Sequence, residues 1–258
     1  MRLHLNEWGD PGAPPVVCLH GITAHGRRFR RLAEERLAPR FRVLAPDLRG
    51  HGRSGYEPPW TIATHLADVV ETIGEAGVER AAWIGHSFGG RLVLELAARE
   101  PERVERAALL DPAINILPHI GLDRAGRELE DESFGSAEEA IEARLASSAV
   151  TPREFLEEEM REHLVPGLDG RLRYRYCRPA VIAAYSDMCA EPPPPETLRA
   201  PALLVYAPEF GLVRDEHLEA FAGRAEVLPV SGGHVVYWDA YEETAAALER
   251  FLLEDPGS

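Results

Sequence analysis

The sequence predicts an α/β protein with a mainly parallel sheet. Short apolar runs alternate along the chain with longer amphipathic segments, which is typical of strands joined by helical crossovers. Several of the runs are continuously apolar, as expected for strands that are covered on both faces. The 258 residues show no internal repeat, so they fit one domain of generous size, or one domain with an insertion.

Seven runs are predicted to be strands. The first, residues 2–8, alternates apolar and polar side chains and is expected at an edge of the sheet. The others are shorter and more apolar, and they lie in chain order at residues 16–20, 42–46, 81–84, 107–110, 202–206 and 226–230.

Two helices of the predicted sheet domain stand out. Residues 88–99 are mostly apolar, which predicts a buried helix. The last helix is expected to begin near Asp239, because Glu242 three residues later gives the spacing of a capping box.

The alternation stops between about residue 118 and residue 196. This stretch is polar and helical in pattern, has no buried-strand run, and ends in a proline-rich segment. We therefore predict a helical cap at 118–196, inserted into a core made of residues 1–117 and 197–258.

The charge of the chain excludes some partners. There are 28 basic residues, all arginine, against 43 acidic ones, which gives a formal net charge of −15. Nucleic acids and anionic membranes should repel such a chain. No stretch has the apolar length of a signal peptide or membrane span, so we expect a cytoplasmic protein.

The three cysteines do not suggest a disulfide framework. Cys18 lies in an apolar run, and free thiols are favoured over a pair between Cys177 and Cys189. There is no CxxC or HExxH spacing, so no metal is expected.

The strongest chemical signal is Gly85-His-Ser-Phe-Gly89. It follows an apolar strand and opens an apolar helix, which is the context that a nucleophile elbow requires. The flanking glycines allow a tight turn that exposes the Ser87 hydroxyl, and the helix N-terminus behind it favours negative charge. Ser87 is therefore the predicted nucleophile.

Two further loops fit the same chemistry. His20-Gly21-Ile22 ends an apolar strand, and the backbone N–H of Ile22 could form an oxyanion hole with that of Phe88. His20 itself is expected to order this loop. His234 follows a glycine pair between the last strand and the last helix, where it could reach Ser87 as a general base.

In this order along the chain, the motifs resemble those of the α/β-hydrolase superfamily, in particular its carboxylesterase-like serine hydrolases. Residues 47–54 also match the family's D-x-R-G-x-G-x-S loop in full, for which we expect a structural role. The resemblance covers nearly the whole chain. It implies a mostly parallel sheet of about eight strands with helices on both faces, a cap after the family's sixth strand, and no cofactor.

The acid of the expected triad is open at this point. The family's usual position after the seventh strand falls on Phe210, next to Glu209. A minority of the family carries the acid after the sixth strand, where this chain has Asp111. We favour Asp111 over Glu209, with Asp215 or no acid as further alternatives. Each would hold one imidazole nitrogen so that the other faces Ser87.

These residues predict a serine hydrolase of a small to medium carboxylic ester, acting through an acyl-enzyme. A neutral ester is expected, because acidic runs in the cap place negative charge near the expected entrance. An alternating stretch with Arg171, Arg173 and Arg175 could recognise an acidic group, although a solvated basic face is favoured.

The alternatives to an ester hydrolase are a C–C bond hydrolase, a lactonase, a thioesterase or a ligand-binding receptor on the same fold. The expected partner is a small acyl substrate. For the oligomeric state, the sequence leaves a monomer and a homodimer open.

Overall fold

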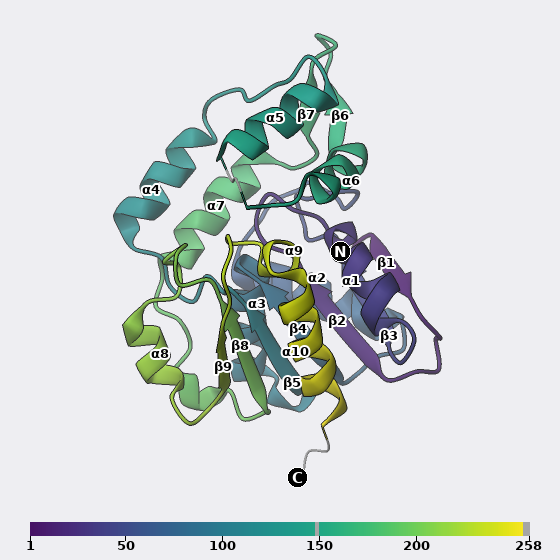
Figure 1. Cartoon of the computed structure of the whole chain (residues 1–258), viewed down its shortest axis with the longest axis vertical. Coiled ribbons are helices and arrows are strands. Elements are labelled where there is room, and N and C mark those ends of the chain that lie inside the picture. Colours follow the sequence, from purple (N-terminus) through teal and green to yellow (C-terminus); the bar gives the residue numbers. More distant parts are fainter. Residues whose placement is uncertain (148–149, 255–258) are drawn as a thin grey trace.

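A mostly parallel sheet of seven strands forms the centre of the computed structural model, which describes residues 1–147 and 150–254 (Figure 1). The strand order is β1-β3-β2-β4-β5-β8-β9, and only β1 runs antiparallel to its neighbour. The strands are β1 (Leu5–Trp8), β2 (Pro15–Leu19), β3 (Arg42–Pro46), β4 (Ala81–His86), β5 (Val104–Leu110), β8 (Ala202–Tyr206) and β9 (Glu226–Pro229).

All seven predicted runs form strands of this sheet, which in the described residues has one strand fewer than the eight or so that the family resemblance implied. In the described residues β1 ends the sheet on one side by pairing with β3, and β9 ends it on the other. The stretch between β3 and β4 is loop followed by helix, because Asp47 folds the loop back on itself.

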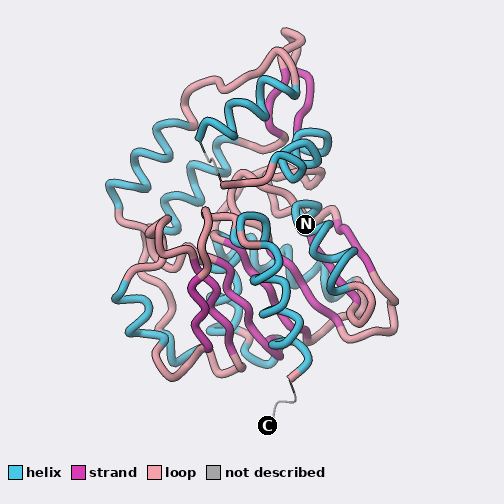
Figure 2. The backbone as a smooth tube through the Cα atoms, viewed as in Figure 1, coloured by secondary structure: helices cyan, strands magenta, loops and turns pink. Residues whose placement is uncertain are grey.

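Helices cover both faces of the sheet, as Figure 2 shows. Successive side chains of β2 enter opposite cores: Cys18 packs with one buried cluster, and Val17 and Leu19 pack with the other. The helices of the sheet domain are α1 (Arg30–Leu32), a π-helical turn Ala33–Leu37, α2 (Ile62–Glu75), α3 (Phe88–Arg99), α8 (Asp215–Phe221), α9 (Val236–Asp239) and α10 (Tyr241–Leu253), with short 3-10 turns at Gly26–Phe29, Pro101–Arg103 and Pro195–Thr197.

The last helix, α10, begins at Tyr241, close to the predicted start near Asp239, but the predicted capping box does not form. The helical conformation is interrupted at Ala240, between α9 and α10, and no side chain caps the N-terminus of α10. Asp239 instead accepts hydrogen bonds from the Thr151 hydroxyl (2.6 Å) and the Val235 N–H (3.1 Å). The carboxylate is therefore used to hold the preceding loop.

The segment between β5 and β8 lies over the carboxyl ends of the strands (Figure 1). It contains α4 (Pro118–Arg127), α5 (Ala137–Ser147), α6 (Arg153–His163), α7 (Arg178–Met188) and a small antiparallel pair, β6 (Leu164–Pro166) with β7 (Leu172–Tyr174). The expectation of a purely helical segment is wrong on this pair, because three-residue, half-exposed strands leave no apolar run in the sequence. We call residues 118–196 the insertion.

Two further expectations concern cysteines and membrane spans. All three cysteines are free thiols, with Cys18 buried in the sheet core. Among the described residues, no helix is both long and apolar enough to cross a bilayer.

Candidate functional site

Ser87 sits at a sharp turn between β4 and α3. Its backbone has φ 53° and ψ −116°, a conformation that costs free energy and is common at functional sites. A Cβ atom at Gly85 would collide with the Gly89 carbonyl, and one at Gly89 with the Leu19 carbonyl, so both positions need glycine. The turn is held by a hydrogen bond from the Ser87 N–H to the Leu110 carbonyl (3.1 Å).

Asp111 and His234 meet beside this turn. Strands β4 and β5 pair at His86 and Leu110, so Ser87 and Asp111 follow neighbouring strand ends. The Asp111 Oδ2 lies 2.6 Å from His234 Nδ1, and its Oδ1 accepts the Ala207 N–H at 3.2 Å. The carboxylate is fully buried, whereas the imidazole is one-quarter exposed. With Nδ1–H donated to Asp111, the free lone pair is on Nε2.

The other two candidate acids lie elsewhere. Glu209 and Asp215 are exposed, and Asp215 begins α8. The residue between them that contacts the imidazole is Phe210, whose ring stacks on His234 at 4.5 Å between centroids. Among the three carboxylates, the structure brings only Asp111 to His234.

His86 also supports His234, a role that the sequence pattern did not indicate. Its Nε2–H donates to the His234 carbonyl (2.9 Å), and the two rings lie 4.6 Å apart. Burial lowers the pKa of His86 well below its ordinary value, so the ring stays neutral at pH 7. A histidine at a strand end gives no local sequence signal for such a contact.

The two predicted oxyanion donors flank Ser87. The Phe88 N–H is the first of α3, whose first N–H groups have no acceptor within the helix. Ile22 follows Gly21, where a Cβ atom would lie 3.0 Å from the Ser87 Cβ. The loop after β2 therefore passes directly against the serine.

His20 orders this loop, as expected. Its Nε2 accepts the Leu48 N–H (2.9 Å), so its Nδ1–H donates to the Gly21 carbonyl (2.7 Å). Burial holds the pKa of His20 well below its ordinary value. Asp47, directly after β3, accepts hydrogen bonds from the N–H groups of Gly26 (2.7 Å) and Arg53 (2.8 Å).

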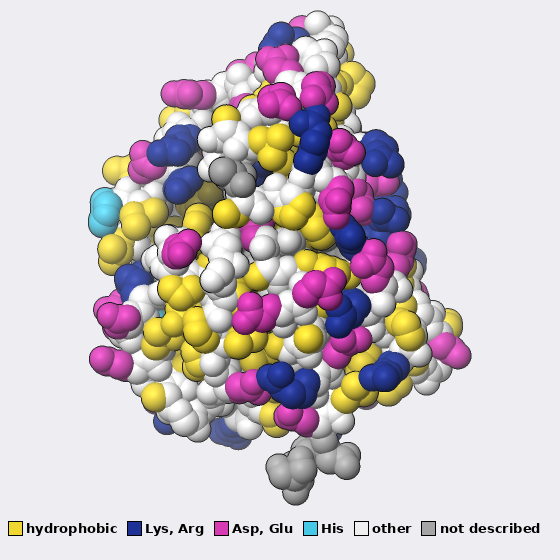
Figure 3. Space-filling view, in the orientation of Figure 1, with side chains coloured by type: hydrophobic (Ala, Val, Ile, Leu, Met, Phe, Trp, Pro, Cys, Tyr) yellow, Lys and Arg dark blue, Asp and Glu magenta, His cyan; other side chains and the backbone are white. Residues whose placement is uncertain are grey.

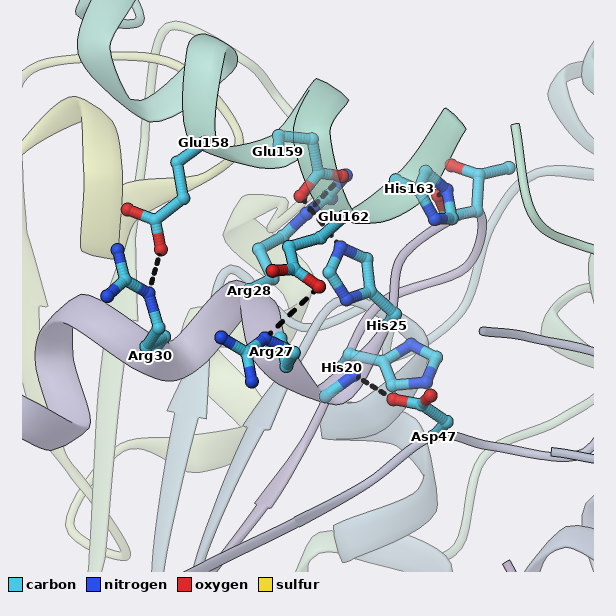
Figure 4. A network of polar contacts seen from close by, with 12 residues as sticks. His20, His25, Arg27, Arg28, Arg30, Asp47, Glu158, Glu159, Glu162 and His163 are labelled. Atoms are coloured by element: carbon cyan, nitrogen blue, oxygen red, sulfur yellow. Dashed lines mark hydrogen bonds and ion pairs between the residues drawn. The ribbon is translucent and has the colours of Figure 1, made fainter. Parts of the chain in front are cut away.

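The insertion also holds the loop after β2 (Figure 4). Glu159 of α6 contacts His25 Nε2 at 3.0 Å and forms an ion pair with Arg28. His163 of α6 donates from Nε2 to the Thr23 carbonyl at 2.9 Å. We call these residues, His25, Arg28, Glu159 and His163 with Thr23, the α6 latch. It joins residues far apart in the chain, so no sequence pattern predicted it.

Three side chains of the α6 latch are metal-ligand types. The donor atoms of His25, Glu159 and His163 lie within 4.8 Å of one another and are buried. Arg28, however, binds the same carboxylate through two nitrogens. A guanidinium already neutralises Glu159, and a second cation beside it would be repelled. The cluster fits an ion-pair network better than a metal centre.

A cavity of about 690 Å³ lies between the insertion and the sheet domain. Thr23, directly after Ile22, and Trp238, from α9, line its wall on the side of the sheet domain. Most of the other lining residues are charged or tyrosine. They are Arg28, Arg124, Arg127, Arg144, Arg173, Arg178, Glu128, Glu130, Asp131, Glu132, Glu159, Tyr174, Tyr176 and Tyr185, with Ser147, Leu156 and Met160. We call this cavity the chamber.

A family model places this arrangement among known proteins. The model of the alpha/beta hydrolase fold matches residues 14–144, about half of the chain. A curated relative, Lipase LipV of Mycobacterium tuberculosis, is 33% identical over 264 residues, covering 97% of each chain. The chain belongs to the α/β-hydrolase family.

Other relatives of this α/β hydrolase match in part or in fold. The 3-hydroxybutyrate-oligomer hydrolase of Cupriavidus necator is 34% identical over 132 residues, covering 50% of this chain and 44% of the relative. The crystal structure of E-2-(acetamidomethylene)succinate hydrolase superposes with a TM-score of 0.86, at 23% identity, and covers 96% of this chain and 94% of that one. At that identity the match shows the α/β-hydrolase fold alone.

Proposed function

We propose that this α/β hydrolase cleaves carboxylic esters through an acyl-enzyme, with Ser87 as nucleophile, His234 as general base and Asp111 as the acid. The contact of 2.6 Å between Asp111 and His234, beside a strained serine, carries the proposal. A buried carboxylate on Nδ1 orients the imidazole and offsets the charge that it gains during the reaction.

The reaction follows from these roles. His234 Nε2 takes the hydroxyl proton as Ser87 Oγ bonds to the carbonyl carbon. The N–H groups of Ile22 and Phe88 bind the oxyanion. The imidazolium then protonates the leaving alcohol, which departs and leaves the acyl group on Ser87. Water, deprotonated by the same imidazole, releases the acid and restores the hydroxyl.

Two kinds of observation support ester hydrolysis. The relatives named above include a lipase and a hydroxybutyrate-oligomer hydrolase, whose names fit ester hydrolysis. The elbow carries a serine, whereas the dehalogenase and epoxide-hydrolase branches of the family use an aspartate there. We also propose residues 118–196 as the cap of the enzyme, and a cytoplasmic location stays a prediction.

A panel of p-nitrophenyl esters of rising acyl length tests the proposal. We expect turnover of at least one ester, and its loss by a factor of at least about 10³ in Ser87→Ala, since the nucleophile is removed. Thioesters, lactones and a β-diketone assayed in parallel distinguish the other hydrolases. Tight binding of these compounds without any turnover would instead support a ligand receptor and contradict the proposal.

A further inference from the structure

The lining of the chamber is less acidic than the chain as a whole. The chain carries a net charge of −15, yet the chamber wall holds one more arginine than acidic side chains. Over the face seen in Figure 3, acidic side chains are interspersed with arginines. The net charge of the sequence therefore does not give the local charge, and the charge of the chamber is counted from its own lining residues.

Most chamber arginines are already neutralised. Arg28 pairs with Glu159, Arg127 with Asp123, and both Arg173 and Arg178 with Asp131. Within the described residues, the guanidinium groups of Arg124 and Arg144 form no ion pair. Arg124 is exposed, whereas Arg144 is half-buried. Arg144 is therefore a half-buried chamber cation without a direct ion-pair partner among the described residues. Burial raises the pKa of the nearby Asp239 carboxyl, and Arg144 is close enough for its charge to act in the opposite direction.

A hydrogen-bond donor lines the same chamber as Arg144. The Tyr174 hydroxyl is buried and has no partner among the described residues. Burial raises the pKa of Tyr174 to about 12, while the charge of Arg144, which lines the same chamber, acts in the opposite direction. The phenol thus keeps its proton at pH 7, and a buried donor without an acceptor is costly unless a ligand supplies one.

The acidic side chains of the wall do not cancel this site. Glu132 is close enough to Tyr174 to affect its pKa, but Glu130 and Glu132 are exposed, so water screens their charges. Glu128 accepts a hydrogen bond from Tyr176 at 3.2 Å, and burial raises the pKa of this carboxyl.

We propose that the chamber binds a carboxylate of the substrate through Arg144 and Tyr174, so that the preferred substrate is an ester that also bears a carboxylate. This inference rests on the proposed ester hydrolysis. Thr23, which lines the chamber, directly follows Ile22, the proposed oxyanion donor, and on this basis we place the carboxylate end of the substrate in the chamber. It replaces the expectation of a neutral ester, which counted acidic residues without their arginine partners.

The experiment compares two pairs of esters of similar length. Mono-p-nitrophenyl succinate is set against p-nitrophenyl butyrate, and mono-p-nitrophenyl glutarate against p-nitrophenyl valerate. The readout is the ratio of kcat/KM for the carboxylate ester to that for its neutral partner. In Arg144→Met we expect this ratio to fall at least about 10-fold, as for a lost hydrogen bond to a charged group. Arg144→Lys should restore part of it.

Two other variants separate binding from folding. Tyr174→Phe removes only a hydroxyl that bonds no other described residue, and should lower the ratio about threefold or more. Arg161→Met is the matched control, because Arg161 is an exposed arginine of the insertion outside the chamber wall. It should leave the ratio unchanged.

The outcomes distinguish the two proposals. If the wild type hydrolyses neutral esters through Ser87 but the ratio is unchanged in both Arg144→Met and Tyr174→Phe, the carboxylate site is wrong and the ester hydrolase stands. Preference for a cationic choline ester over the carboxylate esters would also overturn it. Should no ester be hydrolysed, calorimetric binding of glutarate to wild type but not to Arg144→Met supports the site, and equal binding to both contradicts it.

Discussion

At the scale of single residues, the site depends on Ser87 and Asp111, which follow the ends of neighbouring strands, and on His234, which the loop after β9 brings to them. The sequence favours Asp111 as the acid but does not exclude Glu209, because both precede His234 and both follow a strand. Only the fold decides which carboxylate faces the imidazole. Asp111 is buried at 2.6 Å from Nδ1, whereas Glu209 is exposed and its neighbour Phe210 contacts the ring.

The triad therefore predicts a large difference between two conservative variants. In Asp111→Asn the amide stabilises the wrong imidazole tautomer, so kcat for an ester should fall by about 10³ to 10⁴. Glu209→Gln is the matched control and should stay within about twofold. Steady-state kinetics of both, with circular dichroism to verify folding, check this. Equal losses, or a larger loss in Glu209→Gln, would reject Asp111 as the acid.

At the scale of elements, the strands were predictable and the contacts of the insertion were not. Continuous apolar runs such as residues 16–20 are a local property of the sequence, so all seven strands of the main sheet were predicted. The α6 latch joins His25 to Glu159 across 134 residues, and its members look like ordinary surface charges in the sequence. The strands β6 and β7 were missed for a related reason, because half-exposed residues carry no hydrophobic pattern.

The α6 latch predicts a strong effect of one glutamate and a weak effect of its neighbour. Glu159→Gln leaves the guanidinium of Arg28 buried without its counter-charge, which should cost about 3–5 kcal/mol of unfolding free energy. Glu158 pairs with Arg30 at a partly exposed site, so Glu158→Gln should cost no more than about 1 kcal/mol. Urea denaturation measures both. Similar losses in the two variants would show that the latch does not stabilise the fold.

At the scale of the whole molecule, buried neutral histidines should make the protein sensitive to acid. Burial lowers the pKa of His51 to about 4 and of His65 and His163 to about 3, against an ordinary value of 6.5. Below pH 6.5 the unfolded chain binds protons that the folded chain does not. The stability is therefore complete above pH 6.5 and is lost as the pH falls toward 4, by about 1.4 kcal/mol per pH unit for each group.

Denaturation at pH 7.5, 6.5 and 5.5 tests this dependence. The free energy of unfolding should change little between the first two values and fall steeply toward the third. His65 packs against Phe88, and neither of its ring nitrogens has a partner among the described residues. His65→Leu should therefore reduce the slope below pH 6.5. A slope that is flat in the wild type, or unchanged in the variant, would contradict the assignment.

The central claim, that Ser87 is a nucleophile activated by His234, is tested most directly by a fluorophosphonate probe and peptide mass spectrometry. The account predicts one adduct per chain, located on Ser87, absent in Ser87→Ala and formed much more slowly in His234→Ala. An adduct on another residue, or labelling that persists in Ser87→Ala, would contradict it.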